Sequence, residues 1–362
     1  MTFDVIVAGL GAWGSCAAQH ISARGQRVLG IDRYRPPHVH GSTHGHSRLI
    51  NSKPVSTPAN LKRILRSYEL WRDLERASGR HLMDRIGWLH VGLPTSQRMA
   101  PSVIGTPGDV LSGGEIARRF PELTLRDGEV GVFDPEAAAL DPEECVSAAL
   151  EVAERRGAEL RFDQPISGWS ESENGVEVIT AGETVHADWL VLALGAWTPG
   201  LSRLDLPLWT ERQVMVWFEN PGISIPGFSF PAAPPATSLY GMPESSGRVK
   251  VAFHHGGAIA NPDSVAPVAA ADIDKVCADL AERIPRLTRV VSSATCIYPN
   301  ATDYQYVVGR HPLHPRVVVL AGSSGHGFHQ AQAIGEMAAD LVRGIDRPDI
   351  ESLSLARFGA AD

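Results

Sequence analysis

The sequence predicts an α/β protein of two domains, one built on a parallel sheet and one on a mostly antiparallel sheet. Three observations support this fold class. A strand, a glycine-rich turn, a helix and a second strand follow one another from residue 3 to residue 32, and a further helix is followed by several strands over residues 141–195. Residues 206–255 are rich in strands without intervening helices. A chain of 362 residues is long enough to fill two cores.

A dinucleotide-binding unit is predicted at the start of the chain. Apolar residues 5–7 form a buried strand, Ser15–Arg24 a helix, and Arg27–Ile31 a second strand. Between the first strand and the helix lie three glycines in G-x-G-x-x-G spacing, Gly9, Gly11 and Gly14. They permit a tight turn, backbone approach to a pyrophosphate, and close helix packing, respectively. The phosphates meet the positive end of the helix, and Asp32 is placed to accept from a ribose hydroxyl.

Composition excludes several classes of partner. The net charge of −8 disfavours nucleic acid and anionic membrane surfaces. No apolar run approaches the roughly 20 residues of a membrane span, and the first strand begins too early for a signal peptide. The four cysteines lie far apart, without a C-x-x-C pair, which suits a reducing compartment. We therefore expect a cytoplasmic protein.

A loop with four histidines follows Asp32 (His38, His40, His44 and His46). A metal site and a solvated polar loop are both open interpretations. We favour a third, in which Gly41–Arg48 wraps the bound cofactor, because small residues and a fixed cation suit a diphosphate.

The middle of the chain contributes elements to both domains. Helices are expected over three ranges, Leu61–Ala77, Gly114–Phe120 and Pro142–Arg156, and a short strand over Gly87–Gly92. Residues 94–113 read as loops. Three runs, 158–162, 167–172 and 176–180, predict strands, with an Asn-Gly hairpin turn before the third, and residues 187–195 predict a buried strand. A hairpin inserted here is typical of flavin-binding Rossmann-type domains.

The second half supplies an antiparallel sheet and a return to the first domain. Strands are expected over 212–219, 238–244 and 248–257, then a helix over Ala270–Arg283. A buried strand over Val317–Leu320, a glycine-rich loop and a helix over about Gln330–Arg343 close the chain. We assign residues 1–56, 136–205 and 296–362 to the cofactor domain, and 57–135 and 206–295 to the substrate domain.

Three stretches together resemble the monomeric sarcosine oxidase and N-methyltryptophan oxidase family, within the glycine/D-amino-acid oxidase group. They are GLGAWGS with HGSTHGHSRL near the start, TCIYPNATDYQYVVG at Thr295–Gly309, and AGSSGHGF at Ala321–Phe328. The resemblance covers nearly the whole chain and is weakest between Thr57 and Gly131.

This resemblance implies FAD as cofactor, attached through a thioether to Cys296 in a Cys-x-Tyr motif. Without that context, a small buried hydrophobe is the ordinary interpretation of such a cysteine. The loop Gly322–Phe328 precedes a helix, whose unpaired N–H groups would stabilise negative charge on a reduced flavin. The remaining residues expected to bind the cofactor are Ala12, Trp13, Arg33, Ser42, Thr43, Arg48, Gly195, Trp197, Gly325 and Gly327.

The resemblance also implies four residues around the flavin and substrate. Lys250 matches a lysine thought to activate oxygen by stabilising forming superoxide, and a lysine among apolar residues is costly without a role. The alternation RVKVAF alone favours a lysine that points outward to solvent. His254, His326 and Tyr298 are expected around the substrate, although a solvent-facing loop histidine is the alternative for His326.

Two positions depart from the family pattern. Amino-acid oxidases of this family hold the substrate carboxylate with an arginine and a lysine, where this chain has Asn51 and His329. Loss of both cations removes charge-assisted hydrogen bonds, and only His329 can gain a charge at mildly acidic pH. We therefore expect an amine whose carboxylate is absent, distant or masked, such as a glycyl conjugate or an amino sugar of a specialised biosynthetic pathway.

The resulting hypothesis is an FAD-dependent amine oxidase that converts a small amine to an imine and O₂ to hydrogen peroxide. We expect it to act as a monomer or weak dimer. Three alternatives remain: a flavin dehydrogenase with another electron acceptor, a nicotinamide-dependent reductase, and a non-catalytic nucleotide-binding module. The inserted hairpin and the C-terminal glycine loop argue against the second, and the third leaves Lys250 and Cys296 without a role.

Overall fold

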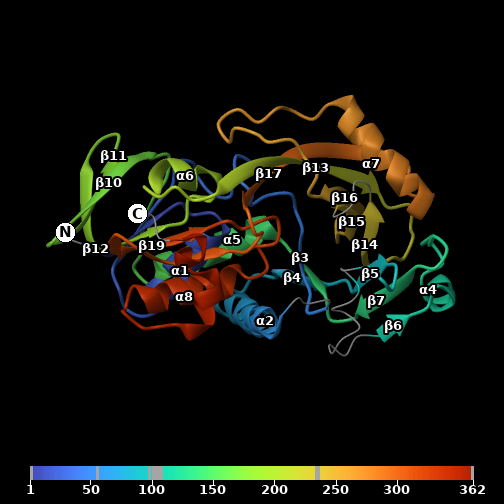
Figure 1. Ribbon diagram of the computed structural model, residues 1–362, viewed down its shortest axis with the longest axis horizontal. Coiled ribbons are helices and arrows are strands. Elements are labelled where there is room, and N and C mark those ends of the chain that lie inside the picture. The colour runs from blue at the N-terminus through green and yellow to red at the C-terminus, as the bar shows by residue number, and fades with distance from the viewer. Residues whose placement is uncertain (1–2, 54–56, 97–98, 100–108, 233–236, 360–362) are drawn as a thin grey trace.

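The computed structural model describes residues 3–53, 57–96, 99, 109–232 and 237–359. Two eight-stranded sheets lie at opposite ends of an elongated molecule, and both chain termini lie at the end that holds the first sheet (Figure 1). A three-stranded sheet lies between them. The predicted α/β class, with one sheet around parallel strands and one mostly antiparallel, is confirmed.

The first sheet has a parallel centre. Its strand order is β10-β11-β12-β1-β2-β9, and β19 pairs with the last residues of β12 and with β18. Strands β1, β2, β9, β12 and β19 run parallel, whereas β10, β11 and β18 are antiparallel neighbours. The strands are β1 Phe3–Ala8, β2 Val28–Ile31, β9 Glu159–Arg161, β10 Ile166–Ser172, β11 Gly175–Thr180, β12 Thr184–Leu192, β18 Val307–His311 and β19 His314–Ala321.

Helices cover one face of this sheet. Helix α1 (Ala12–Ser22) packs against α5 (Pro142–Arg155) and α8 (Ala331–Leu341), and α2 (Pro58–Ser78) packs on α5 and α8. Their apolar faces and one face of the sheet form a single core. Side chains on the other face of the sheet belong to a second apolar cluster, which includes Trp169. Each of these helices was expected, with ends that differ by a few residues.

The second sheet has the order β17-β13-β16-β15-β14-β5-β7-β6 and is antiparallel except for the β14–β5 pair. Helix α7 (Ala270–Arg283) packs on one face over an apolar core. The strands are β5 Trp88–Gly92, β6 Asp109–Leu111, β7 Val130–Asp134, β13 Leu208–Glu219, β14 Gly227–Ala232, β15 Thr237–Pro243, β16 Arg248–His254 and β17 Val290–Ala301. The domain boundary expected after residue 295 falls inside β17.

The small sheet was not predicted. Its order is β3-β8-β4, and its strands are only three residues long (Arg48–Ile50, Ala138–Leu140 and Met83–Arg85). Such short strands leave no periodic signal. The remaining elements are α4 Gly113–Arg119, α6 Thr198–Leu201 and the 3₁₀ turns η1 Gly195–Trp197, η2 Pro348–Leu353 and η3 Leu355–Phe358. Within the described residues, none of the helices combines the length and apolar character needed to cross a bilayer.

Candidate active site

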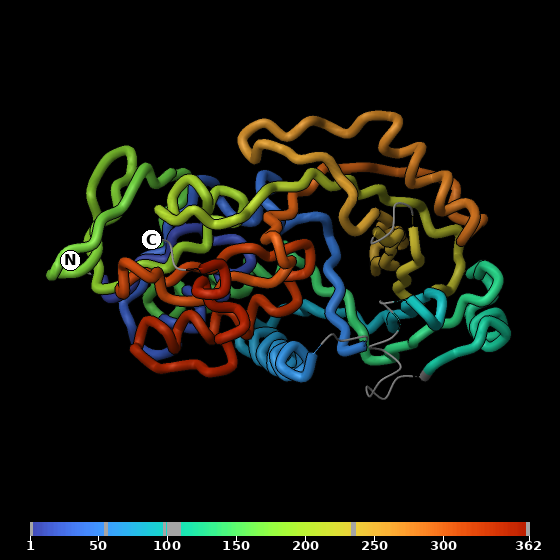
Figure 2. Tube along the Cα trace, in the orientation of Figure 1, coloured from blue at the N-terminus to red at the C-terminus, as the bar shows by residue number. Residues whose placement is uncertain are grey.

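A cavity of about 910 Å³ lies where the parallel strands of the first sheet end and one face of the second sheet begins. Its lining comes from both halves of the chain, because the N-terminal and C-terminal segments run side by side through the first domain (Figure 2). The indole N–H of Trp13 donates to the carbonyl oxygen of Gly327 at 2.8 Å. This is the position at which open α/β sheets bind ligands.

The glycine motif is packed as the sequence predicts. Gly9 has φ +87°, and a Cβ at Gly14 would lie 1.7 Å from the carbonyl oxygen of Gly9. A Cβ at Gly11 would meet only the hydroxyl of Thr43, at 3.4 Å. Helix α1 begins at Ala12, whose N–H donates to the Thr43 hydroxyl at 3.2 Å, and its first turn has no acidic residue. Its N-terminus is therefore open to an anionic group on the cavity side.

Asp32 ends β2 at the edge of the cavity. Its Oδ2 accepts from the backbone N–H of Leu10 at 2.6 Å, and Oδ1 accepts from that of Tyr34 at 2.9 Å. These bonds fix the carboxylate beside the glycine turn, and each oxygen keeps a further lone pair for a ligand hydroxyl.

Arg33 makes an ion pair across the rim of the cavity. Its guanidinium pairs with Asp263 at 2.6 Å, and the indole N–H of Trp197 donates to the same carboxylate oxygen at 2.9 Å. Asp263 belongs to the segment between β16 and α7, which extends from the second sheet. These two contacts thus connect this segment to the first domain, at the end of the cavity where the dinucleotide is expected.

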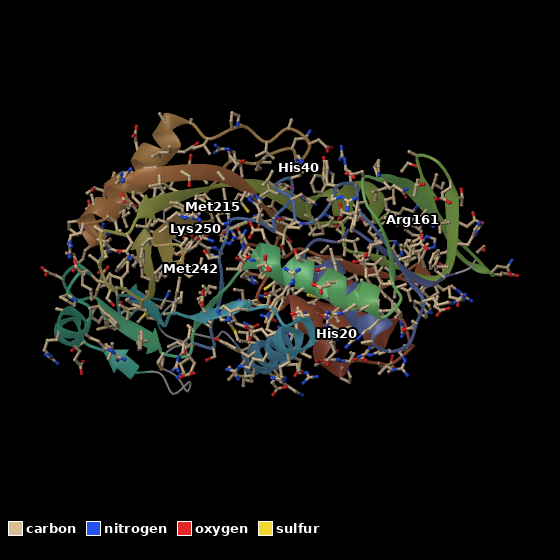
Figure 3. All side chains as sticks on the ribbon, turned by 180° about the vertical axis from the view of Figure 1, so that it is seen from behind. His20, His40, Arg161, Met215, Met242 and Lys250 are labelled. Atoms are coloured by element: carbon tan, nitrogen blue, oxygen red, sulfur yellow. The ribbon has the colours of Figure 1, made fainter. Side chains whose placement is uncertain are left out.

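One face of the second sheet forms a wall of the cavity. The β13–β17 register places Gln213 opposite Cys296, and the β13–β16 and β15–β16 registers align Met215 with Ala252 and Met242 with Lys250. Met215, Lys250 and Met242 lie together on this sheet (Figure 3). The amide nitrogen of Gln213 is buried and has no hydrogen-bond partner within the described part of the chain. A buried donor beside Cys296 fits a ligand that supplies an acceptor there.

Lys250 is fully buried, so the alternative of a lysine that points outward to solvent is wrong. Both faces of the second sheet are covered by other parts of the protein. The alternation of side chains between the two faces therefore does not tell which of them is exposed to solvent. The ammonium donates to the carbonyl oxygens of Gly45, at 3.2 Å, and Ser47. Burial and, second, the charge of Arg48 lower the pKa of Lys250 well below its ordinary value. Its side chain does not line the cavity but supports the 45–47 loop beside it.

Cys296 lies on β17 with its sulfur facing the cavity. A guanidinium nitrogen of Arg48 lies 3.8 Å from this sulfur, and the same nitrogen donates to the carbonyl oxygen of Ser42 at 2.9 Å. Burial raises the pKa of the Cys296 thiol, while Arg48 and Lys250 act in the opposite direction. The 41–48 loop therefore brings a cation to the one cysteine in the cavity wall.

Tyr298 and His254 stand side by side next to the C-terminal glycine loop. Their ring centroids are 5.8 Å apart. A Cβ at Gly325 would lie 2.6 Å from the Tyr298 ring and 2.9 Å from that of His254. Only a glycine lets this loop approach both rings.

His326 is half-buried, and both of its ring nitrogens lie near polar atoms of the protein. Its Nε2 lies 3.1 Å from the carbonyl oxygen of Tyr304, and its Nδ1 lies 2.8 Å from the hydroxyl of Tyr306. Burial lowers the pKa of His326 to about 4, so the ring is neutral at pH 7. The Tyr306 hydroxyl also donates to the backbone carbonyl oxygen of His326 at 2.8 Å, so this tyrosine contacts both the ring and the backbone of His326. The solvent-facing alternative for this histidine is therefore wrong.

The two departures from the family pattern lie on the cavity wall and carry no charge at neutral pH. The Asn51 amide donates to the carbonyl oxygen of Lys53 at 2.6 Å. Burial lowers the pKa of His329 to about 3, with His326 as a second cause. The expectation that His329 gains charge at mildly acidic pH is thus wrong, because burial disfavours its charged form.

The histidine loop gathers aromatic rings. His40 stacks on Tyr34 with ring centroids 4.0 Å apart, and His38 meets Tyr34 edge-on. Burial lowers the pKa of His44 to about 4. Among the described residues, no group of three or more potential ligands is arranged to hold a metal ion.

The structure brings almost all of the predicted site residues to this one cavity. Gly14 packs beneath the turn, and Lys250 lies behind the loop. Sequence reasoning missed Gln213, Tyr240, Met242 and His90, which also line the cavity. The first three are cross-strand partners of Cys296, Ala252 and Lys250, respectively, whereas His90 pairs with Ser229 on β14. The predicted residues that line the cavity are Gly9, Gly11, Ala12, Trp13, Asp32, Arg33, Ser42, Thr43, Arg48, Asn51, Gly195, Trp197, His254, Cys296, Tyr298, Gly322, Gly325, His326, Gly327, Phe328 and His329.

The fold and cavity define a flavin-dependent oxidoreductase. The model of the family described as FAD dependent oxidoreductase matches residues 4–341. The chain belongs to this family. The glycine cradle, the open N-terminus of α1 and the unpartnered Gln213 amide fit FAD as the cofactor.

Within the family, the chain is similar to oxidases that act on amine C–N bonds, and it is an oxidoreductase of that type. It is 39% identical to monomeric sarcosine oxidase of Streptomyces avermitilis, over 94% of both chains. It is 29% identical to N-methyl-L-tryptophan oxidase of Salmonella agona, over 99% of this chain and 100% of that protein. The solved open form of NikD, an unusual amino acid oxidase essential for nikkomycin biosynthesis, superimposes with a TM-score of 0.85 at 23% identity, covering 98% of this chain and 97% of the other.

Proposed function

We propose that this protein is an FAD-dependent amine oxidase whose substrate carries no free carboxylate at the position where amino-acid oxidases bind one. FAD supplies the acceptor for a hydride equivalent from the carbon next to nitrogen, and an imine results. The observation that carries the substrate assignment is the neutrality of two wall residues. The Asn51 amide is uncharged, and the pKa of His329 is about 3 because of burial.

The remaining cation of this wall is already engaged. Arg48 donates to the carbonyl oxygens of Ser47 and Ser42, at 2.8 and 2.9 Å, and faces the Cys296 sulfur. A substrate carboxylate would be desolvated here without the two charge-assisted partners that offset that cost. The named substrates of two relatives, sarcosine and N-methyl-L-tryptophan, are free amino acids. An ester, an amide, a glycyl conjugate or an amino sugar fits the neutral wall better.

The cofactor is held at three places in this proposal. The N-terminus of α1 binds the pyrophosphate, Asp32 the ribose, and the 322–328 loop the flavin. Cys296 forms the thioether tether, which its place in the cavity wall beside Arg48 supports. All four cysteines are free thiols in the structure, which agrees with the proposed cytoplasmic location.

Lys250 stabilises the negative charge that develops on O₂ when the flavin is reoxidised to yield hydrogen peroxide. One observation favours a second candidate, a flavin dehydrogenase with another acceptor. Burial lowers the pKa of Lys250 well below its ordinary value, which weakens the lysine as a fixed cation.

The test compares sarcosine with sarcosinamide, which differ in the charge at the carboxyl carbon. The purified flavoprotein is mixed with each amine without oxygen, and the flavin absorbance near 450 nm is followed before air is admitted. Loss of absorbance with sarcosinamide but not with sarcosine supports the proposal. Equal or faster reduction by sarcosine contradicts the substrate class, and reduced flavin that persists in air identifies a dehydrogenase.

A further inference from the structure

Two buried serine hydroxyls are open to the cavity and make no hydrogen bond within the protein. Ser229 on β14 and Ser238 on β15 are 5% and 4% exposed, and both line the cavity. Among the described residues, neither hydroxyl donates to or accepts from another group, and neither oxygen is enclosed by protein atoms. A buried polar group of this kind costs free energy unless a ligand or water supplies its partner.

The two serines lie close enough for one small ligand to reach both. Ser229 is the cross-strand partner of Tyr240, and Ser238 precedes Tyr240 by two residues on the same face of β15. Such diagonal positions place Cα atoms about 7–8 Å apart. Hydroxyl groups on one six-membered ring or one short carbon chain can therefore form hydrogen bonds to both side chains.

This part of the cavity wall is distant from the proposed flavin tether. The sheet order runs from β17, which carries Cys296, through β13, β16 and β15 to β14, and each of these strands contributes to the lining. Neighbouring strands are about 4.8 Å apart, so Ser229 lies about 19 Å along the sheet from Cys296. The fused rings of a flavin are shorter than this distance. The β14–β15 end of the wall therefore remains for the part of the substrate that does not react.

The surroundings of the two serines favour a neutral ligand with both polar and apolar surface. Trp88 on β5 and Met242 on β15 line the cavity and offer apolar surface to a carbon skeleton. His90, the cross-strand partner of Ser229, also lines it. The charged side chains of the described lining lie at the dinucleotide end or beside Cys296: Asp32, Arg33 and Arg48. A hydroxyl group suits this end of the wall, because it both donates and accepts hydrogen bonds.

We infer that the substrate is a hydroxylated amine, such as an amino sugar or an amino polyol, whose hydroxyl groups bind Ser229 and Ser238. This inference rests on the proposed amine oxidation and selects among the neutral substrates that the wall admits. The reacting amine lies at the flavin, and the hydroxylated end of the substrate extends along the wall toward β14. The two serines determine specificity and take no part in the redox step.

The selectivity arises from the hydrogen bonds that a wrong substrate leaves unmade. A substrate hydroxyl that displaces water from a serine restores the hydrogen bond that the water made. An apolar group of similar size displaces the same water and leaves the serine hydroxyl buried without a partner. Sites built to hydrogen-bond a substrate hydroxyl therefore strongly reject the analogue that lacks it.

The first experiment compares N-methylglucamine with N-methylhexylamine, two secondary amines that share the same carbon chain and differ only in their hydroxyl groups. Anaerobic flavin reduction at low substrate gives a rate constant for each amine, and we call the ratio of the two constants the preference ratio. We expect a preference ratio of at least about 10 in favour of N-methylglucamine. N-methylglucosamine and N-methylcyclohexylamine repeat the comparison on a ring. Perturbation of the oxidised flavin spectrum measures the binding of each amine separately from turnover.

The second experiment assigns the preference to the two serines. Ser229→Ala and Ser238→Ala should each lower the preference ratio by about 3- to 10-fold, and the double variant should lower it further. Ser229→Thr keeps a hydroxyl at this position and should retain most of the preference. Ser292→Ala is the matched control, because Ser292 lies exposed on β17 of the same sheet and outside the cavity.

The outcomes separate this inference from the proposed function. Flavin reduction by sarcosinamide and N-methylhexylamine, without a preference for the hydroxylated member of either pair, overturns the inference and leaves the amine oxidase intact. A preference that is unchanged in the double serine variant also overturns it. Binding of N-methylglucamine that the serine substitutions weaken, without flavin reduction by any amine, contradicts the proposed function instead.

Discussion

The sulfur of Cys296 lies 3.8 Å from a guanidinium nitrogen of Arg48, although the two residues are 248 positions apart in the chain. Burial disfavours the thiolate of Cys296, and the guanidinium favours it. The thiolate is the reactive form, and Arg48 acts against the effect of burial, which still raises the pKa of this thiol. Through Arg48, the 41–48 loop thus acts on the cysteine to which we propose that the flavin is attached.

Cys296→Ala is expected to release the flavin. In the wild type, acid precipitation leaves the yellow colour in the pellet, because the thioether survives denaturation. In the variant the colour passes to the supernatant, and absorbance of both fractions measures the distribution. Cys277→Ala, on α7 and away from the cavity, serves as control and keeps the colour in the pellet. Colour in the wild-type supernatant would show that FAD binds without a tether.

Asn51→Arg combined with His329→Lys is expected to introduce turnover of free sarcosine. The two substitutions restore charge-assisted hydrogen bonds, each worth about 1.5–3 kcal/mol, so the ratio of kcat/KM for sarcosine to that for sarcosinamide rises by 100-fold or more. Peroxide formation with each substrate measures the ratio. Asn51→Gln with His329→Gln preserves polarity without charge and leaves the ratio unchanged. If sarcosine turnover stays undetectable in the charged variant, the neutral wall does not set selectivity.

Lys250→Met is expected to slow reoxidation by O₂ while leaving flavin reduction intact. Removing one preorganised charge costs about 10²–10³ in rate, and methionine fills the buried space. Because the pKa of Lys250 is lowered, the wild-type reoxidation rate should fall with rising pH well before an ordinary lysine would titrate. Stopped-flow mixing of reduced protein with oxygenated buffer measures both effects. Lys275→Met on the exposed side of α7 is the control, and equal rates in all three proteins would remove Lys250 from the oxygen reaction.

Gly14→Ala is expected to lower both stability and cofactor content. The added Cβ would lie 1.7 Å from a backbone oxygen, so α1 must move away from the Gly9 turn. Overpacking of this kind costs about 1–3 kcal/mol or more, and it displaces the phosphate-binding end of the helix. Thermal unfolding and the ratio of flavin to protein absorbance measure the two losses. Gly182→Ala, where a Cβ meets nothing within 4 Å, should match the wild type.

Glu129→Gln is expected to destabilise the second domain by about 3–5 kcal/mol at pH 7, because it leaves Arg283 buried without its partner. The guanidinium donates to both oxygens of Glu129, at 2.6 and 2.8 Å. Burial raises the pKa of Glu129, but these bonds outweigh it and hold the pKa below its ordinary value. The stability from this pair is therefore complete above the unfolded-state pKa of about 4.3 and is lost as pH falls through the lower folded value.

Urea unfolding at pH 7 and at decreasing pH values measures this contribution. The difference between Glu129→Gln and wild type should shrink below pH 4. Glu282→Gln breaks an exposed pair with Arg126 and should change stability little at any pH. A difference that is independent of pH would assign the loss to packing rather than charge.

The first sheet and its helices were predictable because their signals are local. The glycines at positions 9, 11 and 14, the cap at Asp141 with Pro142, and the Asn-Gly hairpin before β11 each specify a backbone conformation within a few residues. The observed cap bond, from the backbone N–H of Glu144 to Asp141, confirms this interpretation. Strands β3, β4 and β8 escaped prediction because three residues cannot establish a period.

The site was predictable only in part, because register across the second sheet is not visible in one strand. The side chains of RVKVAF alternate between the two faces of the sheet whether one face or both faces are buried. The burial of Lys250 therefore could not be predicted from this strand alone. Glu211 and His255 lie 44 positions apart and meet through a left-handed residue at the end of β16. A general preference for histidine in such turns is too weak to foresee that contact.

The contact between Trp13 and Gly327 spans 314 residues and closes the cavity from the two ends of the chain. During synthesis, a ribosome must therefore release almost the entire polypeptide before the binding site exists. Contacts of such separation form late and slowly. Binding of the flavin is then a final step of folding. A chain truncated before the last helix would lack part of the binding site and would remain colourless.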